Sequence, residues 1–238
     1  MLPHKLTLCL CLIFFNSSSI LGQQRKPPAG GRIAIVVDER LAALRATPQL
    51  NGRLVRRLSR GRLLAVRSFK TSADGISFFL VNVSSRTHGW IQREAVVSPS
   101  RPGEDQRLLT LIERSEGFDR IQRARILLDQ FPRSRLRPAV LLLLGDTAED
   151  LAAKLSADAA RRLKHDRGDA PEFSYFLNYT GLDRYNRQGI TFVFDHSTKR
   201  FHYDGSAWRE LIRRYPHSLF ATEAKIKLDS LYSQLRMK

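Results

Sequence analysis

The chain has 238 residues, enough for one large domain or two small ones. An apolar fraction of 42%, with 14 glycines and 10 prolines, argues against a disordered chain and indicates that most of it folds. The formal net charge of +17 comes mainly from arginines spread along the sequence, which excludes a single basic tail. The charge is either an arginine-rich soluble surface or an attraction for a polyanion, such as nucleic acid, anionic lipid or an acidic wall polymer.

Residues 1–22 have the layout of a secretory signal peptide. Lys5 precedes an apolar run of ten residues (6–15), and a small, polar stretch follows to Gly22. The run is too short to span a bilayer and no later stretch is long and apolar enough, so we predict no transmembrane segment after cleavage. Cys9 and Cys11 both lie inside the signal without a lipobox, which leaves a mature chain without cysteine and with a net charge of +16 after loss of Lys5. We therefore predict an exported protein, periplasmic or extracellular, for which nucleic acid is not a suitable partner.

Proline and glycine mark the boundaries of the expected units. Residues 23–31 form a polar linker, and residues 99–105 form a second one. Between them, residues 32–98 contain five or six short β-branched or aromatic runs, including 32–37, 63–66 and 78–83, separated by Gly, Asn and Ser. This pattern predicts a small β-barrel or sandwich.

Short motifs occur in a recognisable order within residues 32–98. They are Leu44-Arg45, Pro48, Val55 and Leu58, Gly61 with Leu64 and Val66, Phe79 and Val81, and Gly89-Trp90-Ile91. Their order and spacing resemble those of a bacterial SH3-type (SH3b) domain. The chain departs from that pattern at two positions: alanine (Ala42 or Ala43) stands where the family has asparagine, and Phe79 stands where it has tryptophan.

The resemblance implies a barrel of the cell envelope that contacts peptidoglycan or peptides. Arg45, Pro48, Phe79 and Trp90 are the candidate ligand-binding residues: the two aromatic rings offer apolar faces, and the guanidinium suits a carboxylate. The alternative is that Phe79 and Trp90 fill the core and that Arg45 is a solvated strand residue.

Residues 106–238 change to a helical period and contain one turn twice. Phe131-Pro132-Arg133-Ser134 and Tyr215-Pro216-His217-Ser218 lie 84 residues apart, each between two amphipathic runs. The proline ends one helix and the serine caps the next, so each copy predicts a helical hairpin. A long amphipathic run extends from about Pro138 to Leu163, and Gly145 leaves open whether it is one helix or two.

A β-hairpin is expected at about 190–203, between the helical units. Residues 190–194 and 200–203 are β-branched or aromatic, and a polar turn separates them. The paired helical hairpins resemble tetratricopeptide-like repeats of bacterial envelope proteins, which implies protein–protein interaction. The expected fold class is therefore α+β and multidomain: an SH3-like β-barrel followed by a mainly α-helical, tetratricopeptide-like domain with an inserted hairpin.

No motif of a known catalytic centre is present. The chain lacks a Gly-x-Ser-x-Gly elbow, a His-Glu-x-x-His motif and a Walker loop, and without mature cysteine it has no Cys/His peptidase centre. Asp195, His196, His202 and Asp204 are the one cluster with zinc-type ligands, but hairpin residues of this kind usually face water. Asp146, Glu149 and Asp150 are expected to be a solvated acidic edge. We expect no catalytic residue, metal or cofactor.

These observations predict an exported, non-enzymatic adaptor of the bacterial cell envelope. Its barrel would contact peptidoglycan or a peptide, and its helices would bind an envelope protein. Two alternatives stay open: a wall-active enzyme or accessory factor of a wall hydrolase, and a purely structural barrel that caps the helices. The sequence indicates neither the partner nor the oligomeric state.

Overall fold

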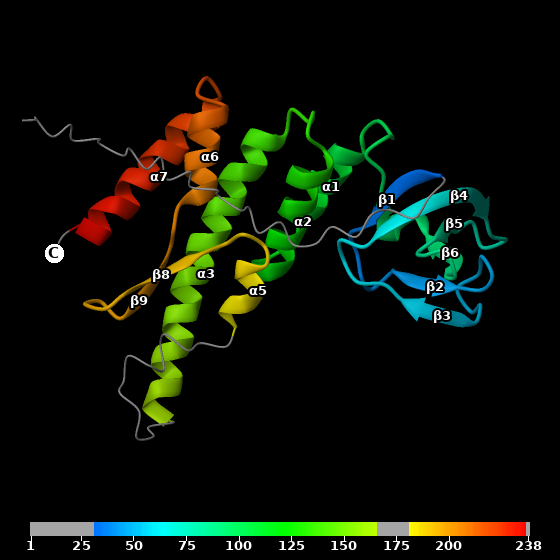
Figure 1. The fold of residues 1–238 in the computed structure, drawn as a ribbon, viewed down its shortest axis with the longest axis horizontal. Helices are drawn as coiled ribbons and strands as arrows, with labels where there is room; N and C mark the ends of the chain where they lie inside the picture. The colour runs from blue at the N-terminus through cyan, green and yellow to red at the C-terminus, as the bar shows by residue number, and fades with distance from the viewer. Residues whose placement is uncertain (1–30, 166–180, 237–238) are drawn as a thin grey trace, which may run out of the picture.

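The computed structural model describes residues 31–165 and 181–236 and has the predicted α+β class. The expected signal peptide (1–22) and residues 23–30 of the first linker lie outside the described residues. Figure 1 shows the sheet at one end of the molecule, followed by α1 and α2, then α3, then α6 and α7. The strands are β1 (Arg32–Val36), β2 (Ala43–Arg45), β3 (Leu54–Arg57), β4 (Leu63–Thr71), β5 (Ser77–Asn82), β6 (His88–Gln92), β7 (Val96–Val97), β8 (Phe192–Asp195) and β9 (Arg200–Tyr203). The helices are η1 (Arg93–Ala95), α1 (Glu104–Glu113), α2 (Gly117–Gln130), α3 (Arg137–His165), α5 (Leu182–Asn186), α6 (Ser206–Arg214) and α7 (Leu219–Arg236).

The first seven strands form one antiparallel sheet in the order β3-β2-β6-β5-β4-β1-β7. The two end strands do not pair with each other among the described residues, so the sheet is open and does not close into the β-barrel expected from the sequence. Arg107 of α1 occupies the position beside β7, where its guanidinium donates to the carbonyls of Val96 (2.8 Å) and Glu94 (2.7 Å). A helix side chain therefore satisfies the backbone groups that a neighbouring strand would bond in a closed barrel.

The Gly-Trp-Ile motif begins with a glycine because β2 and β6 approach closely at that point. A Cβ atom on Gly89 would lie 2.7 Å from the carbonyl oxygen of Arg45 and 2.9 Å from Leu44 Cγ. Contacts that short are not tolerated, and the nearer atom belongs to the backbone. Only glycine fits between the two strands.

Strand β1 is buried on both faces and connects two hydrophobic cores. Ala34 and Val36 point into a core formed within the sheet, whereas Ile35 and Val37 belong to the core of the helices. Alternate side chains of a strand point to opposite faces, so an uninterrupted apolar run fits a strand covered on both sides. The sheet and the helices are thus packed together rather than loosely tethered.

Two arginines hold the end of β1 against α2. Arg123, which is buried, donates from Nε to the carbonyl of Val37 at 3.1 Å, and Arg60 donates to the same carbonyl at 3.2 Å. Arg60 also pairs with Asp119 at 2.8 Å, and this hydrogen bond lowers the pKa of the Asp119 carboxyl. Asp38, hydrogen-bonded to Arg40, likewise has a lowered pKa. Charged hydrogen bonds therefore seal the junction between sheet and helices.

The repeated turn has the same hydrogen bonds in both copies. Phe131 and Tyr215 donate their N–H groups to Leu127 (3.0 Å) and Leu211 (2.9 Å), which closes the preceding helices. Ser134 Oγ then accepts from the N–H of Leu136 at 3.2 Å, and Ser218 Oγ accepts from Phe220 at 3.3 Å. Each copy joins two helices, α2 to α3 and α6 to α7, and α3 packs against α6.

Helix α3 is one continuous helix of 29 residues, so Gly145 does not divide it. A Cβ atom at this position would lie 2.2 Å from the Nε1 atom of Trp208 on α6. The glycine is a notch in which the indole ring sits, and Trp208 Nε1 donates to Asp146 Oδ1 at 3.2 Å. Close packing of α6 on α3 therefore compensates for the low helix propensity of glycine.

The expected hairpin is present as β8 and β9, with Phe192 opposite Tyr203 and Asp195 opposite Arg200. Its aromatic residues Phe201 and Tyr203 are buried in the core of the helices. In Figure 1 the hairpin runs from the end of α5 across the front of α3, and its turn lies beyond α3, away from the sheet. Among the described helices, none combines the length and apolar character needed to cross a bilayer.

Candidate binding site

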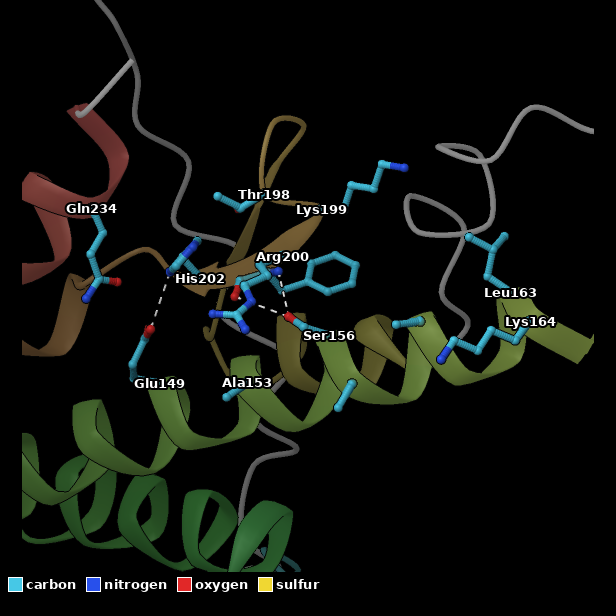
Figure 2. A pocket seen from close by; sticks show the side chains of 13 residues that line it. Glu149, Ala153, Ser156, Leu163, Lys164, Thr198, Lys199, Arg200, His202 and Gln234 are labelled. Atoms are coloured by element: carbon cyan, nitrogen blue, oxygen red, sulfur yellow. Dashed lines mark hydrogen bonds and ion pairs between the residues drawn. The ribbon is translucent and has the colours of Figure 1, made fainter.

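Two adjoining cavities lie along α3 and together form what we call the α3 groove. The first has a volume of about 530 Å³ and lies between α3, the β8–β9 turn, β9 and the end of α7 (Figure 2). The second, of about 320 Å³, lies between α3 and α7. Glu149 of α3 and Gln234 of α7 line both cavities, so the two adjoin.

The first cavity has a narrow apolar floor and a basic rim. Ala153, Ala157 and Ala160 of α3 line the floor, and their short side chains leave space above the helix. Exposed Lys164, Lys199 and Arg200 line the mouth, against one carboxylate, that of Glu149. Lys199 has a φ of 55° and is the only described non-glycine residue in the left-handed region. Its place in the tight hairpin turn brings its side chain to the cavity.

The wall formed by β9 is fixed by side chains of α3. Ser156 Oγ accepts from the N–H of Phe201 at 2.7 Å, and Glu149 Oε2 accepts from the N–H of Tyr203 at 2.8 Å. Along an antiparallel strand, backbone N–H groups point alternately toward the paired strand and away from it. The N–H groups of Phe201 and Tyr203 point away from β8 and toward α3, on either side of His202. Glu149 and Ser156, two helical turns apart on α3, thus provide the acceptors that a neighbouring strand would provide. They hold β9 at a set distance from the helix.

His202 lies in the cavity wall beside Glu149. The residue is 9% exposed, and its Nδ1 atom is buried without a hydrogen bond to any described residue. Nδ1 lies 3.4 Å from Glu149 Oε1, and Figure 2 shows the two side chains pointing toward each other between α3 and β9. The carboxylate of Glu149 is thus the charged group that faces this imidazole.

The second cavity contains a partly buried ion pair. Lys227 Nζ of α7 lies 3.2 Å from Asp146 Oδ1, the same oxygen that accepts from Trp208. Burial raises the pKa of the Asp146 carboxyl despite the lysine beside it. Burial by itself would lower the pKa of Lys227, but attraction and hydrogen bonding to Asp146 and Glu223 together raise it. Next to this pair, Ile226 is 65% exposed at the edge of the groove.

The acidic residues of α3 are therefore not a solvated edge. Asp146 and Glu149 are half-buried and bond to α6, α7 and β9, while Asp150 alone is exposed. In the hairpin, Asp195 accepts hydrogen bonds from Ser197 and Thr198 and so stabilises the turn. Within residues 31–165 and 181–236, no group of three or more His, Cys, Asp or Glu side chains is arranged to hold a metal ion.

The four residues suggested by the SH3-type pattern lie on the sheet, away from the α3 groove. Arg45 and Trp90 are directly paired across β2 and β6, so their side chains share one face, and both are half-buried. Pro48 is half-buried in the turn after β2, and Arg45 Nη1 donates to the carbonyl of Gly52 in that turn (2.9 Å). Phe79 pairs with Ile91 instead, so it faces the other side and belongs to the sheet core.

Sequence patterns single out few residues of the α3 groove. His202 appears as a possible metal ligand, and Asp146, Glu149 and Asp150 appear as an acidic edge. Two signals in α3 indicate that the helix packs against a second element besides α2. They are the buried Ser156 and the alanines Ala153, Ala157 and Ala160. Comparisons with protein-family models, with curated proteins and with solved structures give no match to this chain. Function is therefore inferred from the residues and their geometry.

Proposed function

We propose that this chain is an exported, non-enzymatic binding protein of the bacterial cell envelope. Its SH3-type sheet contacts peptidoglycan or a peptide, and its tetratricopeptide-like helices hold a peptide segment in the α3 groove. The observation that carries the proposal is the groove itself, with its alanine floor and basic rim. The segment belongs either to the wall or to an envelope protein, and in both cases it carries a negative charge.

The dimensions of the groove suit a peptide. Its first cavity alone falls in the range of about 300–1,000 Å³ that is usual for ligand sites, and the second extends it along α3. The alanine floor admits an extended backbone, while Lys164, Lys199 and Arg200 attract carboxylates from solution. Both walls are already attached to α3, so binding orders few residues and costs little entropy.

The sheet supplies a second contact. Arg45 and Trp90 stand side by side on one face, which is the arrangement expected for a carboxylate and an apolar group of a wall peptide. Phe79 faces the sheet core, so we leave it out of this contact. The positive charge of the chain favours encounter with anionic wall components and makes the binding sensitive to salt.

The test is co-sedimentation of residues 23–238 with purified peptidoglycan sacculi across a salt series. Two variants address the two surfaces. Ala157→Phe fills the exposed floor of the groove, and Trp90→Ala removes the aromatic face of the sheet. Lys154→Phe is the matched control, because Lys154 is exposed on α3 and does not line the groove. Circular dichroism checks that each variant folds.

We expect binding that weakens as salt rises. Loss in Ala157→Phe alone would assign the wall peptide to the groove. Loss in Trp90→Ala alone would assign the wall to the sheet and leave the groove for an envelope protein. No binding by the native chain would refute wall attachment, and release of muropeptides into the supernatant would overturn the non-enzymatic assignment.

The shared core supports a structural role of the sheet beside its binding role. Ile35, Val37 and Val97 of the sheet cover Leu108 and Ile112 of α1, both fully buried. Urea denaturation of residues 105–238 alone tests this role. Removal of the sheet should lower the unfolding midpoint of the helices, whereas an unchanged midpoint would show that the sheet does not stabilise them.

A further inference from the structure

Strand β3 is a free sheet edge with an unusual surface. It ends the seven-stranded ladder, and all four of its residues are exposed. Leu54 and Val55 are 46% and 40% exposed, and Leu50 in the preceding turn is 43% exposed. An exposed strand edge with large apolar side chains is a template on which another extended chain can pair.

Two other strand edges, those of β7 and β9, are covered by side chains of helices. Arg107 donates to the carbonyls of Glu94 and Val96 beside β7, and Ser156 and Glu149 accept from the outward N–H groups of β9. Within residues 31–165 and 181–236, no side chain makes such a bond to the outer edge of β3. The fold thus protects those two edges and leaves this one open.

The charged side chains of β3 and of the strands next to it are basic. Residues 46–57, which form β3 and the turn before it, contain Arg53, Arg56 and Arg57, the neighbouring β2 ends with Arg45, and these segments and β6 contain no aspartate or glutamate. Arg53, Arg56 and Arg57 are exposed and form no ion pair with any other described residue. This concentration of positive charge would repel the same edge of a second copy of the chain, which excludes self-pairing.

We propose that the β3 edge binds an acidic, extended segment of a partner protein, which pairs with it as an eighth strand. Main-chain hydrogen bonds to β3 would supply the affinity, as in other cases of strand addition. Because alternate side chains of a strand point to opposite faces, the carboxylates of an alternating segment would meet Arg53 and Arg57 on one face of the sheet. Its apolar side chains would lie on the other face and cover Leu54. The site lies on the sheet edge and is independent of the α3 groove.

The test is fluorescence anisotropy with residues 23–238 and a labelled eight-residue peptide of alternating valine and glutamate. A valine–lysine peptide tests the sign of the charge. The valine–glutamate peptide with every backbone amide N-methylated keeps the carboxylates but cannot pair as a strand. The triple variant Arg53→Gln, Arg56→Gln, Arg57→Gln removes the proposed partners Arg53 and Arg57 together with the remaining positive charge of β3. The matched control, Arg133→Gln, Arg187→Gln, Arg213→Gln, removes the same charge from exposed positions elsewhere.

We expect the valine–glutamate peptide to bind and to slow hydrogen exchange in residues 53–57. The β3 variant and the N-methylated peptide should each weaken binding at least tenfold, whereas the control variant should change it by less than twofold. Equal binding of the N-methylated peptide would replace strand addition with simple charge attraction, such as any acidic polymer would experience. An equal loss in the control variant would overturn the assignment to β3.

Discussion

The replacement Gly145→Ala tests whether α6 packs on α3 through contact between Trp208 and Gly145. In an exposed helix, this change adds about 1 kcal/mol of stability because alanine has the higher helix propensity. Here the new Cβ would lie 2.2, 2.6 and 2.7 Å from three atoms of the Trp208 ring. Carbon atoms pack best at about 3.5–4.0 Å, so the indole must move by roughly 1 Å. Trp208 is 3% exposed and its ring packs edge-on against Tyr203, with centroids 5.6 Å apart, so that movement is obstructed.

The change in unfolding free energy caused by Gly145→Ala is the sum of two losses and one gain. Forcing extra volume into a packed site costs about 1–3 kcal/mol. The shift also weakens the hydrogen bond from Trp208 to Asp146, a loss of about 1 kcal/mol. After the gain in helix propensity, we expect a net destabilisation of about 1–3 kcal/mol. For a chain of this size, that corresponds to a fall in Tm of about 3–10 °C.

Urea denaturation followed by circular dichroism measures the change. Ala153→Gly, at an exposed position of the same helix, gives the propensity contribution directly. The double variant Gly145→Ala, Trp208→Leu should recover part of the lost stability, which appears as a coupling of about 1 kcal/mol or more in the double-mutant cycle. If Gly145→Ala instead stabilised the protein by as much as Ala153→Gly destabilises it, the close packing of the Trp208 ring against Gly145 would be refuted.

Three further predictions concern the sheet, the junction and the repeated turn. Gly89→Ala should cost about 1–3 kcal/mol in thermal unfolding, because its Cβ would press on the backbone of Arg45, and a cost below about 0.5 kcal/mol would contradict this packing. The ion pair with Arg60 lowers the pKa of Asp119, so its contribution is present above the unfolded pKa of about 4 and is lost as pH falls through the lower folded value. Asp119→Asn should therefore flatten the decline in urea midpoint between pH 5 and pH 3, and an unchanged decline would exclude this pair as its source. Ser134→Ala removes the acceptor of the Leu136 N–H just before α3 and the donor to Asp105, and should lower the unfolding free energy by about 1 kcal/mol, with Ser134→Thr as the retaining control.

Local chemistry was sufficient to predict the repeated turn. Proline lacks the amide proton that a helix needs, and the serine two positions later bonds to the next helix, so four adjacent residues determine the structure. The same holds for the β8–β9 hairpin, whose two runs are separated only by a short polar turn. Strand β1 was also recognisable, since its apolar run is continuous.

Features that depend on distant residues could not be predicted in this way. Gly145 looks like a weak point in a helix until Trp208, 63 positions later, is placed in the notch. Closure of the sheet depends on whether its end strands meet, and Arg107 takes the place beside β7. The α3 groove requires β9 and α7 to lie against one helix, and their attachment through Ser156 and Glu149 has no counterpart in the local pattern.

The attachments along α3 also explain why the groove is preformed. At the start of the helix, buried Arg137 donates to the hydroxyl of Tyr215 at 2.9 Å and to the carbonyl of Leu128, which joins the two copies of the turn. In the middle, Trp208 sits in the notch at Gly145, and further along Ser156 holds β9. From Arg137 to Ser156 these contacts span about 29 Å of helix, at about 1.5 Å per residue. Because the walls are fixed at several points over this length, a ligand would enter a groove of constant width, and its binding should change the backbone little.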